Sequence, residues 1–85
     1  MDDLRFKINS IDNSLLHLIK ERMQTSIEIG KYKKNNNLPI YDEKREKELL
    51  EKLNNENKKS NIILEEKFIN DFWNNIMSYS KKLQE

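Results

Sequence analysis

Apolar side chains in the first third of the chain recur in alternating steps of four and three residues. The positions of this seam are Leu4, Ile8, Ile11, Leu15, Leu18, Arg22, Thr25 and Ile29. This spacing places the side chains on one face of an α-helix and predicts a single helix from about Asp3 to Asn35. At about 1.5 Å per residue such a helix spans roughly 45 Å, more than the diameter of a domain this small, so much of it would protrude from a monomer.

Two shorter apolar stripes predict two further helices. Leu38 and Pro39 form an extended connector, because a residue that precedes proline is disfavoured in the helical region, and Asp42 suits the N-cap of a second helix. The stripe of this helix, which the polar stretch 54–61 interrupts, consists of Leu49, Leu50 and Leu53. A third helix is expected from about Ile62 or Leu64 to Leu83. Its broad apolar face is expected to fill the core and consists of Phe68, Ile69, Phe72, Trp73, Ile76 and Met77.

The scarcity of chain breakers sets the fold class. With one Gly and one Pro in 85 residues, the chain is expected to be all-α, a single helical domain over 1–85. A core in so short a chain is marginal by itself. The heptad-like spacing of the long seam therefore predicts a homodimer, in which the same helix of a second copy covers the seam in antiparallel orientation.

Charge and cysteine content exclude several classes of function. The net charge of +1 comes from 16 basic and 15 acidic residues mixed along the chain, which leaves no broad basic face for nucleic acid. Zero Cys excludes disulfides and thiolate metal sites, and no metal site is apparent elsewhere. The lone His17 is expected to be a surface or boundary residue rather than a ligand. Without a signal peptide or a transmembrane run, the sequence favours a cytoplasmic protein with no membrane association.

Arg22 interrupts the apolar seam at a position where the pattern asks for a hydrophobic residue. A guanidinium placed there must find an anion or lose much of its hydration. One interpretation is a buried Arg paired with a nearby Asp or Glu. The other is a binding site for an anionic ligand.

Helical geometry brings other charged residues to the same region. Lys33 follows Arg22 by eleven residues, close to three turns, so both project from one face with Cα atoms roughly 16 Å apart. Arg5 lies about 25 Å from Arg22 along the axis and is turned roughly 100° away, so within one chain it cannot reach the same small ligand. In an antiparallel dimer it can. Gly30 lies within this helix, where it costs about 1 kcal/mol relative to Ala, and close packing or ligand approach would explain its use.

The other two helices carry polar groups at matching places. Asp42, Arg45 and Glu46 share one face of the second helix, which is either a solvated surface or the wall of a pocket. The apolar stripe of the third helix ends in Ser80 and Gln84, one turn apart, where hydrogen-bonding groups replace hydrophobic ones.

This order of residues resembles the all-helical (AroQ-class) chorismate mutases over essentially the whole chain. The matching segments are Leu4-Arg5-Phe6-Lys7-Ile8-Asn9-Ser10-Ile11-Asp12, Leu15-Leu16, Glu21-Arg22, Glu28-Ile29-Gly30-Lys31-Tyr32-Lys33, Pro39-Ile40-Tyr41-Asp42, Arg45-Glu46, Ser80 and Gln84. The asparagine run 35–37 and the linker 54–61 follow no pattern of that family. The match in the third helix therefore depends on Phe68, Trp73, Ser80 and Gln84.

The resemblance implies an intertwined homodimer of three-helix protomers with two equivalent sites. It also implies the [3,3] Claisen rearrangement of chorismate to prephenate in aromatic amino acid biosynthesis, with no cofactor and no nucleophile. Arg22 and Arg5 of the partner subunit would hold the two substrate carboxylates, which suits guanidinium chemistry. The remaining roles fall to further residues: Arg45 and Ser80 at the pocket edge, Lys33 and Gln84 as donors to the ether oxygen, and Glu46 and Asp42 at the ring hydroxyl.

Two other functions are compatible with parts of the pattern. A relative of this fold removes pyruvate from isochorismate in a similar basic pocket, and the sequence does not exclude that reaction. A non-enzymatic helical dimerisation module would use the seam as an interface only. Such a module predicts apolar residues at positions 22, 80 and 84, where this chain has polar ones.

Overall fold

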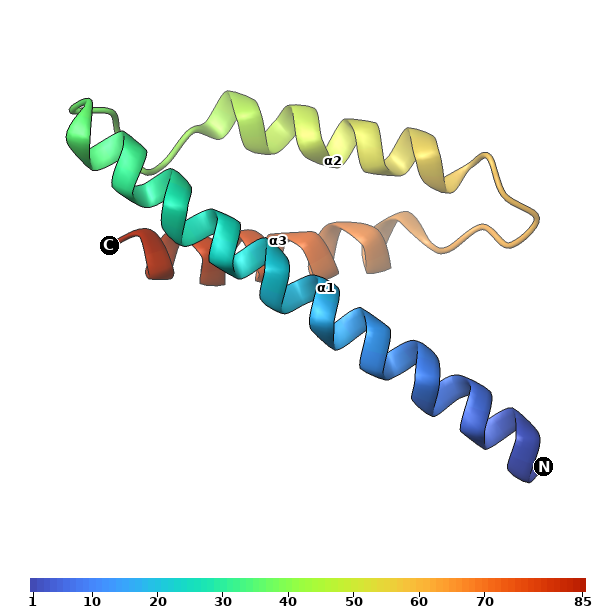
Figure 1. Ribbon diagram of the computed structural model, residues 1–85. Helices are drawn as coiled ribbons and strands as arrows, with labels where there is room; N and C mark the ends of the chain where they lie inside the picture. Colours follow the sequence, from blue (N-terminus) through green and yellow to red (C-terminus); the bar gives the residue numbers. More distant parts are fainter.

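A computed structural model describes residues 1–85 as three helices without a strand, which confirms the all-α prediction. They are α1 (Asp2–Asn35), α2 (Glu43–Asn57) and α3 (Glu66–Gln84). Figure 1 shows α3 running back beside α2 while α1 crosses α3 at an angle, and α3 packs against both other helices. The molecule is elongated, with extents of 52 × 24 × 16 Å, because the N-terminal part of α1 projects beyond the other two helices.

The ends of α1 follow from local chemistry. Asp2 and Asp3 lie in its first turn and Lys33 and Lys34 in its last, so both ends complement the helix dipole. Asn37 adopts a left-handed conformation with φ 56°, and Leu38 N–H donates to the Lys33 carbonyl at 2.8 Å. This is a Schellman-type end, in which Asn takes the position most often occupied by Gly. The predicted end of the first helix near the asparagine run is confirmed.

The second helix begins as predicted but ends later. Asp42 is its N-cap, and the Asp42 carboxylate accepts a hydrogen bond from Arg45 N–H at 3.1 Å. The helix continues to Asn57 through part of the polar stretch that was expected to break it. Asn54 explains the difference, because its side-chain amide donates to Asn70 on α3 at 2.9 Å. A polar side chain thus contributes a contact between helices that the apolar pattern does not reveal.

The third helix begins at Glu66, after the predicted start at Ile62 or Leu64. The Asn57 side chain binds both backbone groups of Leu64: it accepts from Leu64 N–H at 3.0 Å and donates to the Leu64 carbonyl at 2.7 Å. These bonds hold the backbone of Leu64 in the non-helical connection that precedes α3. The Asn57 side chain, at the end of α2, therefore shifts the start of α3 to a later residue.

The core is small and lies where α1 crosses α3. Its buried members are Met23, Ser26, Gly30, Ile69, Met77 and Ser80. The expectation that all the α3 aromatics fill this core is wrong for Phe68, which is 54% exposed, while Phe72 and Trp73 are half-buried against each other. The reason is that in a single chain the N-terminal part of α1 turns away and leaves this end of α3 uncovered.

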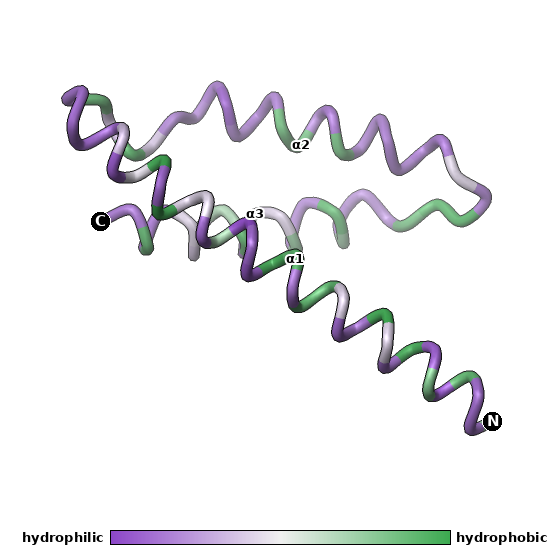
Figure 2. Tube along the Cα trace, viewed as in Figure 1, coloured by the Kyte–Doolittle hydropathy of each residue, from purple (hydrophilic) through white to green (hydrophobic).

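The N-terminal half of α1 carries exposed apolar side chains. Figure 2 shows hydrophobic positions recurring along this projecting segment, and Leu4, Ile8, Ile11, Leu15 and Leu18 are between 43% and 67% exposed. His17 is exposed on the same segment, as predicted. No helix is both long enough and apolar enough to cross a membrane.

Candidate active site

A cavity of about 340 Å³ lies where the C-terminal part of α1, the connector 36–42, the start of α2 and the end of α3 meet. Seven of the eight predicted site residues line it. They are Arg22, Lys33, Asp42, Arg45, Glu46, Ser80 and Gln84. The three helices therefore bring together polar residues that lie up to 62 positions apart, between Arg22 and Gln84.

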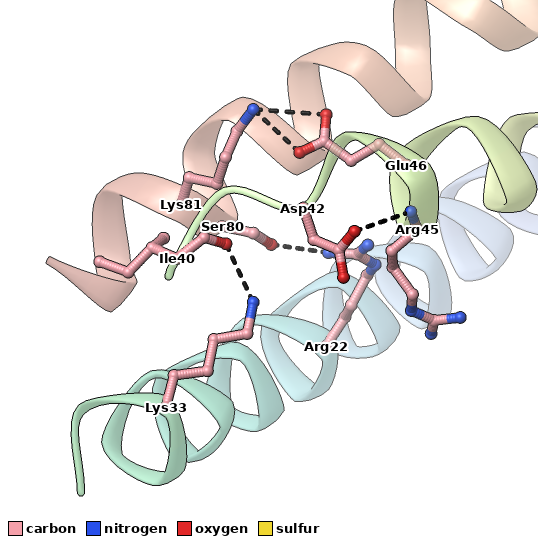
Figure 3. Close-up of polar contacts among 8 residues, drawn as sticks. All are labelled: Arg22, Lys33, Ile40, Asp42, Arg45, Glu46, Ser80 and Lys81. Atoms are coloured by element: carbon pink, nitrogen blue, oxygen red, sulfur yellow. Dashed lines mark hydrogen bonds and ion pairs between the residues drawn. The ribbon is translucent and has the colours of Figure 1, made fainter. Parts of the chain in front are cut away.

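Arg22 is held in this cavity without a carboxylate partner. Its guanidinium donates to the Ser80 hydroxyl at 2.6 Å (Figure 3), and that hydroxyl is in turn 3.5 Å from the sulfur of Met23. None of the four ion pairs in the molecule includes Arg22, so its interpretation as a buried Arg paired with an acid is wrong for this chain. Burial, and after it the positive charge of Arg45, lowers the pKa of Arg22. Both causes disfavour the bare cation, and an anion bound beside it would relieve them.

Lys33 is positioned by the connector between α1 and α2. Its ammonium donates to the Ile40 carbonyl at 2.9 Å, as Figure 3 shows. An ammonium carries three protons, so this bond leaves two for a ligand in the cavity. The Schellman-type end of α1 turns the chain back over Lys33, which is how a local backbone feature sets the direction of a charged side chain.

Gln84 lines the cavity at a point where α1 and α3 pack unusually closely. A Cβ built on Gly30 would lie 2.9 Å from the Cα, Cβ and Cγ atoms of Gln84, so no larger residue fits there without a shift of α3. Close packing at Gly30 is therefore confirmed. The Gln84 Oε1 atom is buried with no hydrogen-bond partner, which marks a side chain with unused polar capacity at the cavity.

The start of α2 supplies the two carboxylates of the cavity. Asp42 uses one oxygen to cap the helix, and Arg45 follows on the same face. Glu46 pairs with Lys81 of α3 at 3.0 Å. The shared-face prediction for the start of α2 is confirmed, and the face is a cavity wall rather than a purely solvated surface.

Lys81 also lines the cavity, although it was not among the predicted site residues. It lies three residues before Gln84 and four after Met77, so its position on the same face of α3 was available from helical spacing. Helical spacing alone did not single it out, because adjacent lysines such as Lys81 and Lys82 near the C-terminal end of a helix are usually solvated residues that complement the helix dipole.

Arg5 is the one predicted site residue that lies outside the cavity. It is exposed in the first turn of α1, on the projecting part of the helix. This placement agrees with the geometric argument that Arg5 cannot reach the ligand of its own chain.

The cavity has a net positive charge. Its cations are Arg22, Lys33, Arg45 and Lys81, and its anions are Asp42 and Glu46, which gives four positive against two negative charges. A small dianion suits this balance. The donors are fixed by hydrogen bonds and packing, which is the arrangement needed to stabilise negative charge that develops during a reaction.

Comparisons with known proteins agree on one family. A family model described as chorismate mutase type II matches residues 4–85. The chain is 45% identical over 58 residues to a bifunctional chorismate mutase/prephenate dehydratase of Buchnera aphidicola, a match that covers 68% of this chain and 15% of that protein. For the bifunctional enzyme of Escherichia coli K12, the identity is 44% over 50 residues, or 59% of this chain and 13% of that protein.

A solved structure supports the same arrangement of helices. A conserved hypothetical protein from Pyrococcus furiosus superposes with a TM-score of 0.76 and 34% sequence identity, covering 96% of this chain and 91% of that one. The chain thus matches nearly the full length of that protein, whereas it spans only 15% or less of the two bifunctional relatives.

Proposed function

Since this chain belongs to the type II chorismate mutase family, we propose that it converts chorismate to prephenate by a [3,3] Claisen rearrangement. The observation that carries the proposal is the cavity, in which Arg22 has no anionic partner and faces the same space as Lys33 and Gln84. Chorismate is a dicarboxylate, and its rearrangement transfers no proton and needs no nucleophile. A site made of fixed cations and amide donors is sufficient for this chemistry.

The first task of the site is to hold the substrate in its compact reactive conformer. Arg22 binds one carboxylate, and the Ser80 hydroxyl, already in contact with Arg22, lies beside it. Arg45 adds positive potential at the cavity edge. Glu46, together with Asp42 at the start of α2, accepts a hydrogen bond from the ring hydroxyl of the substrate. This bond sets the orientation of the ring.

The second task is to stabilise the transition state. As the C–O bond of the substrate breaks, negative charge develops on the ether oxygen. Lys33 and Gln84 donate hydrogen bonds to that oxygen, Lys33 through a proton not used by Ile40 and Gln84 through its amide nitrogen. The bonds strengthen as charge develops, so they lower the barrier more than they tighten substrate binding.

The active assembly in this proposal is a homodimer. The exposed seam of α1 packs against a second copy, and Arg5 of the partner subunit enters the cavity to bind the second carboxylate. The support is geometric: the projecting half of α1 carries both the uncovered apolar residues and Arg5. We further propose that the protein acts in the cytoplasm, without cofactor, metal, nucleic acid or membrane as partner.

An ultraviolet assay with purified protein tests the proposed reaction. Chorismate loss is followed, prephenate is identified as the product, and isochorismate is assayed in parallel. Saturable formation of prephenate supports the mutase. Pyruvate from isochorismate alone selects the lyase, and no turnover of either compound by a folded dimer selects the dimerisation module.

A further inference from the structure

The ion pair between Lys81 and Glu46 differs from every other ion pair in the molecule. The Lys81 ammonium lies 3.0 Å from one oxygen of the Glu46 carboxylate and 3.3 Å from the other, so it contacts both (Figure 3). The two side chains are 27% and 23% exposed. In the other three pairs each side chain is at least 60% exposed, and both partners lie within four residues of each other in the sequence.

Lys81 also contacts the connector that carries the cavity rim. Its ammonium lies over the ring of Tyr41, 4.5 Å from the centroid, in the geometry of a cation–π interaction. Tyr41 follows Ile40, whose carbonyl accepts the hydrogen bond from Lys33. One ammonium thus joins α3, the start of α2 and the connector at the point where all three border the cavity.

We propose that Lys81 is a positioning residue for Glu46, and that it keeps this carboxylate from occupying the cations meant for the substrate. The inference rests on the proposed function. Arg22, Lys33 and Arg45 line the same cavity as Glu46, and Arg22 has no carboxylate partner. A free glutamate in this space is attracted to those cations, and it repels a dicarboxylate substrate.

Lys81 prevents both effects. Its ammonium neutralises the Glu46 charge and holds the carboxylate at the α2–α3 side of the cavity, where one lone pair of each oxygen remains free for the ring hydroxyl. The net charge of the cavity is then set by Arg22, Lys33, Arg45 and Asp42. Lys81 therefore acts on substrate affinity through Glu46 and has no role at the breaking bond.

The test is a double-variant cycle on the full chain, with kcat and KM for chorismate as readouts. Lys81→Gln is expected to raise KM about tenfold and to change kcat by less than about threefold, because it releases a negative charge near the bound dianion. In a Glu46→Gln background, the same Lys81→Gln change is expected to alter KM by less than about threefold, since the charge that Lys81 neutralises is gone. Lys81→Arg, which keeps the charge, restores most of the affinity.

Two controls separate positioning from stability. Lys82→Gln removes the neighbouring exposed lysine and is expected to leave KM unchanged. Thermal unfolding of Lys81→Gln reports any loss of fold, and Lys81→Met, which keeps a long unbranched apolar side chain, provides a second charge-free variant if Lys81→Gln is unstable.

The outcomes distinguish this inference from the proposed function. If the folded wild-type protein does not turn over chorismate, the proposed function fails and the role of Lys81 fails with it. If wild-type turnover is present but Lys81→Gln leaves KM unchanged, only the role of Lys81 is overturned. Equal KM effects with Glu46 and with Gln at position 46 also overturn it, because Lys81 would then act directly on the substrate.

Discussion

At the scale of single residues, the site is defined by polar side chains whose hydrogen-bonding capacity the protein itself leaves partly unused. Arg22 donates to a neutral hydroxyl, and Gln84 has a buried oxygen without a partner. Both features cost stability in the free protein, because buried polar groups are expensive when they are poorly paired. In the proposed function both side chains contact substrate, Arg22 through its guanidinium and Gln84 through its amide nitrogen.

Arg22→Leu is expected to abolish chorismate turnover without lowering the unfolding temperature. The lowered pKa of Arg22 means that its charged form is less favourable in the folded chain than in the unfolded one. This penalty is present at every pH below that pKa, and therefore throughout the physiological range. Leu removes the penalty and completes the apolar seam, which offsets the lost hydrogen bond to Ser80, worth about 1 kcal/mol.

Circular dichroism melting and the chorismate assay on the same preparation check this prediction. Lys20→Leu, at an exposed position of α1, is the control for adding an apolar side chain to the helix. A clear drop in unfolding temperature in Arg22→Leu alone would assign Arg22 a structural role.

Lys33→Ala is expected to lower kcat on the order of 10²-fold or more, about 3 kcal/mol, with a smaller effect on KM. The reason is that the hydrogen bond from Lys33 to the ether oxygen is strongest in the transition state, when negative charge has developed on that oxygen. Steady-state kinetics measure the split between kcat and KM, and Lys31→Ala on the exposed face of the same turn is the control. A variant that keeps its kcat and only binds chorismate more weakly would contradict the proposed role.

At the scale of elements, two helix ends both stabilise their helix and position residues of the cavity. The Schellman-type end of α1 turns the connector over Lys33, and the N-cap of α2 places Asp42, Arg45 and Glu46 at the cavity. Because the caps stabilise the helices and also aim the polar side chains, a change in a cap is expected to alter stability and substrate binding together.

Two substitutions of Asp42 separate the effect on stability from the effect on substrate binding. Asp42→Ala loses the cap bond to Arg45 N–H and is expected to cost about 1 kcal/mol of unfolding free energy and to raise KM. Asp42→Asn keeps an equally good cap and is expected to stay near wild type in both. Urea unfolding and chorismate kinetics give the two quantities. If Asp42→Asn keeps its stability but loses substrate affinity, the negative charge of Asp42 itself binds the substrate.

At the scale of the whole molecule, a single chain leaves half of its longest helix uncovered. The core where α1 crosses α3 contains only six buried residues, and the apolar seam projects beyond it. So small a core is marginal for a chain of 85 residues. In the proposed dimer, the same contact between the two α1 helices buries the seam and brings Arg5 of the partner subunit to the cavity.

Mixing two inactive variants tests the shared site. Arg5→Ala and Arg22→Ala are each expected to be nearly inactive, and a mixed dimer has one site with both arginines intact. Random exchange of subunits gives about half mixed dimers with one restored site of two, so about a quarter of wild-type activity is expected. Differently tagged chains allow the mixed dimer to be isolated before the assay. Inactive, verified mixed dimers would rule out a site shared between chains.

The spacing of residues along the sequence determined much of this protein by itself. Helical periodicity is a local property, so it predicted the three helices, and with it the common face of Arg22 and Lys33 and that of Asp42, Arg45 and Glu46. Asp42 was recognisable as an N-cap because its partner, Arg45 N–H, is only three residues away. The cavity was predictable to the extent that its residues follow helical spacing.

Only the tertiary structure decided the features that depend on contacts between helices. The late end of α2 and the late start of α3 follow from Asn54 bound to Asn70 and Asn57 bound to Leu64, pairings that no local pattern contains. The incomplete burial of Phe68 follows from the direction in which α1 leaves the core. The pairing of Lys81 with Glu46 joins residues 35 positions apart. The physical reason is the same in each case: periodicity sets which residues share a face, and packing sets what that face meets.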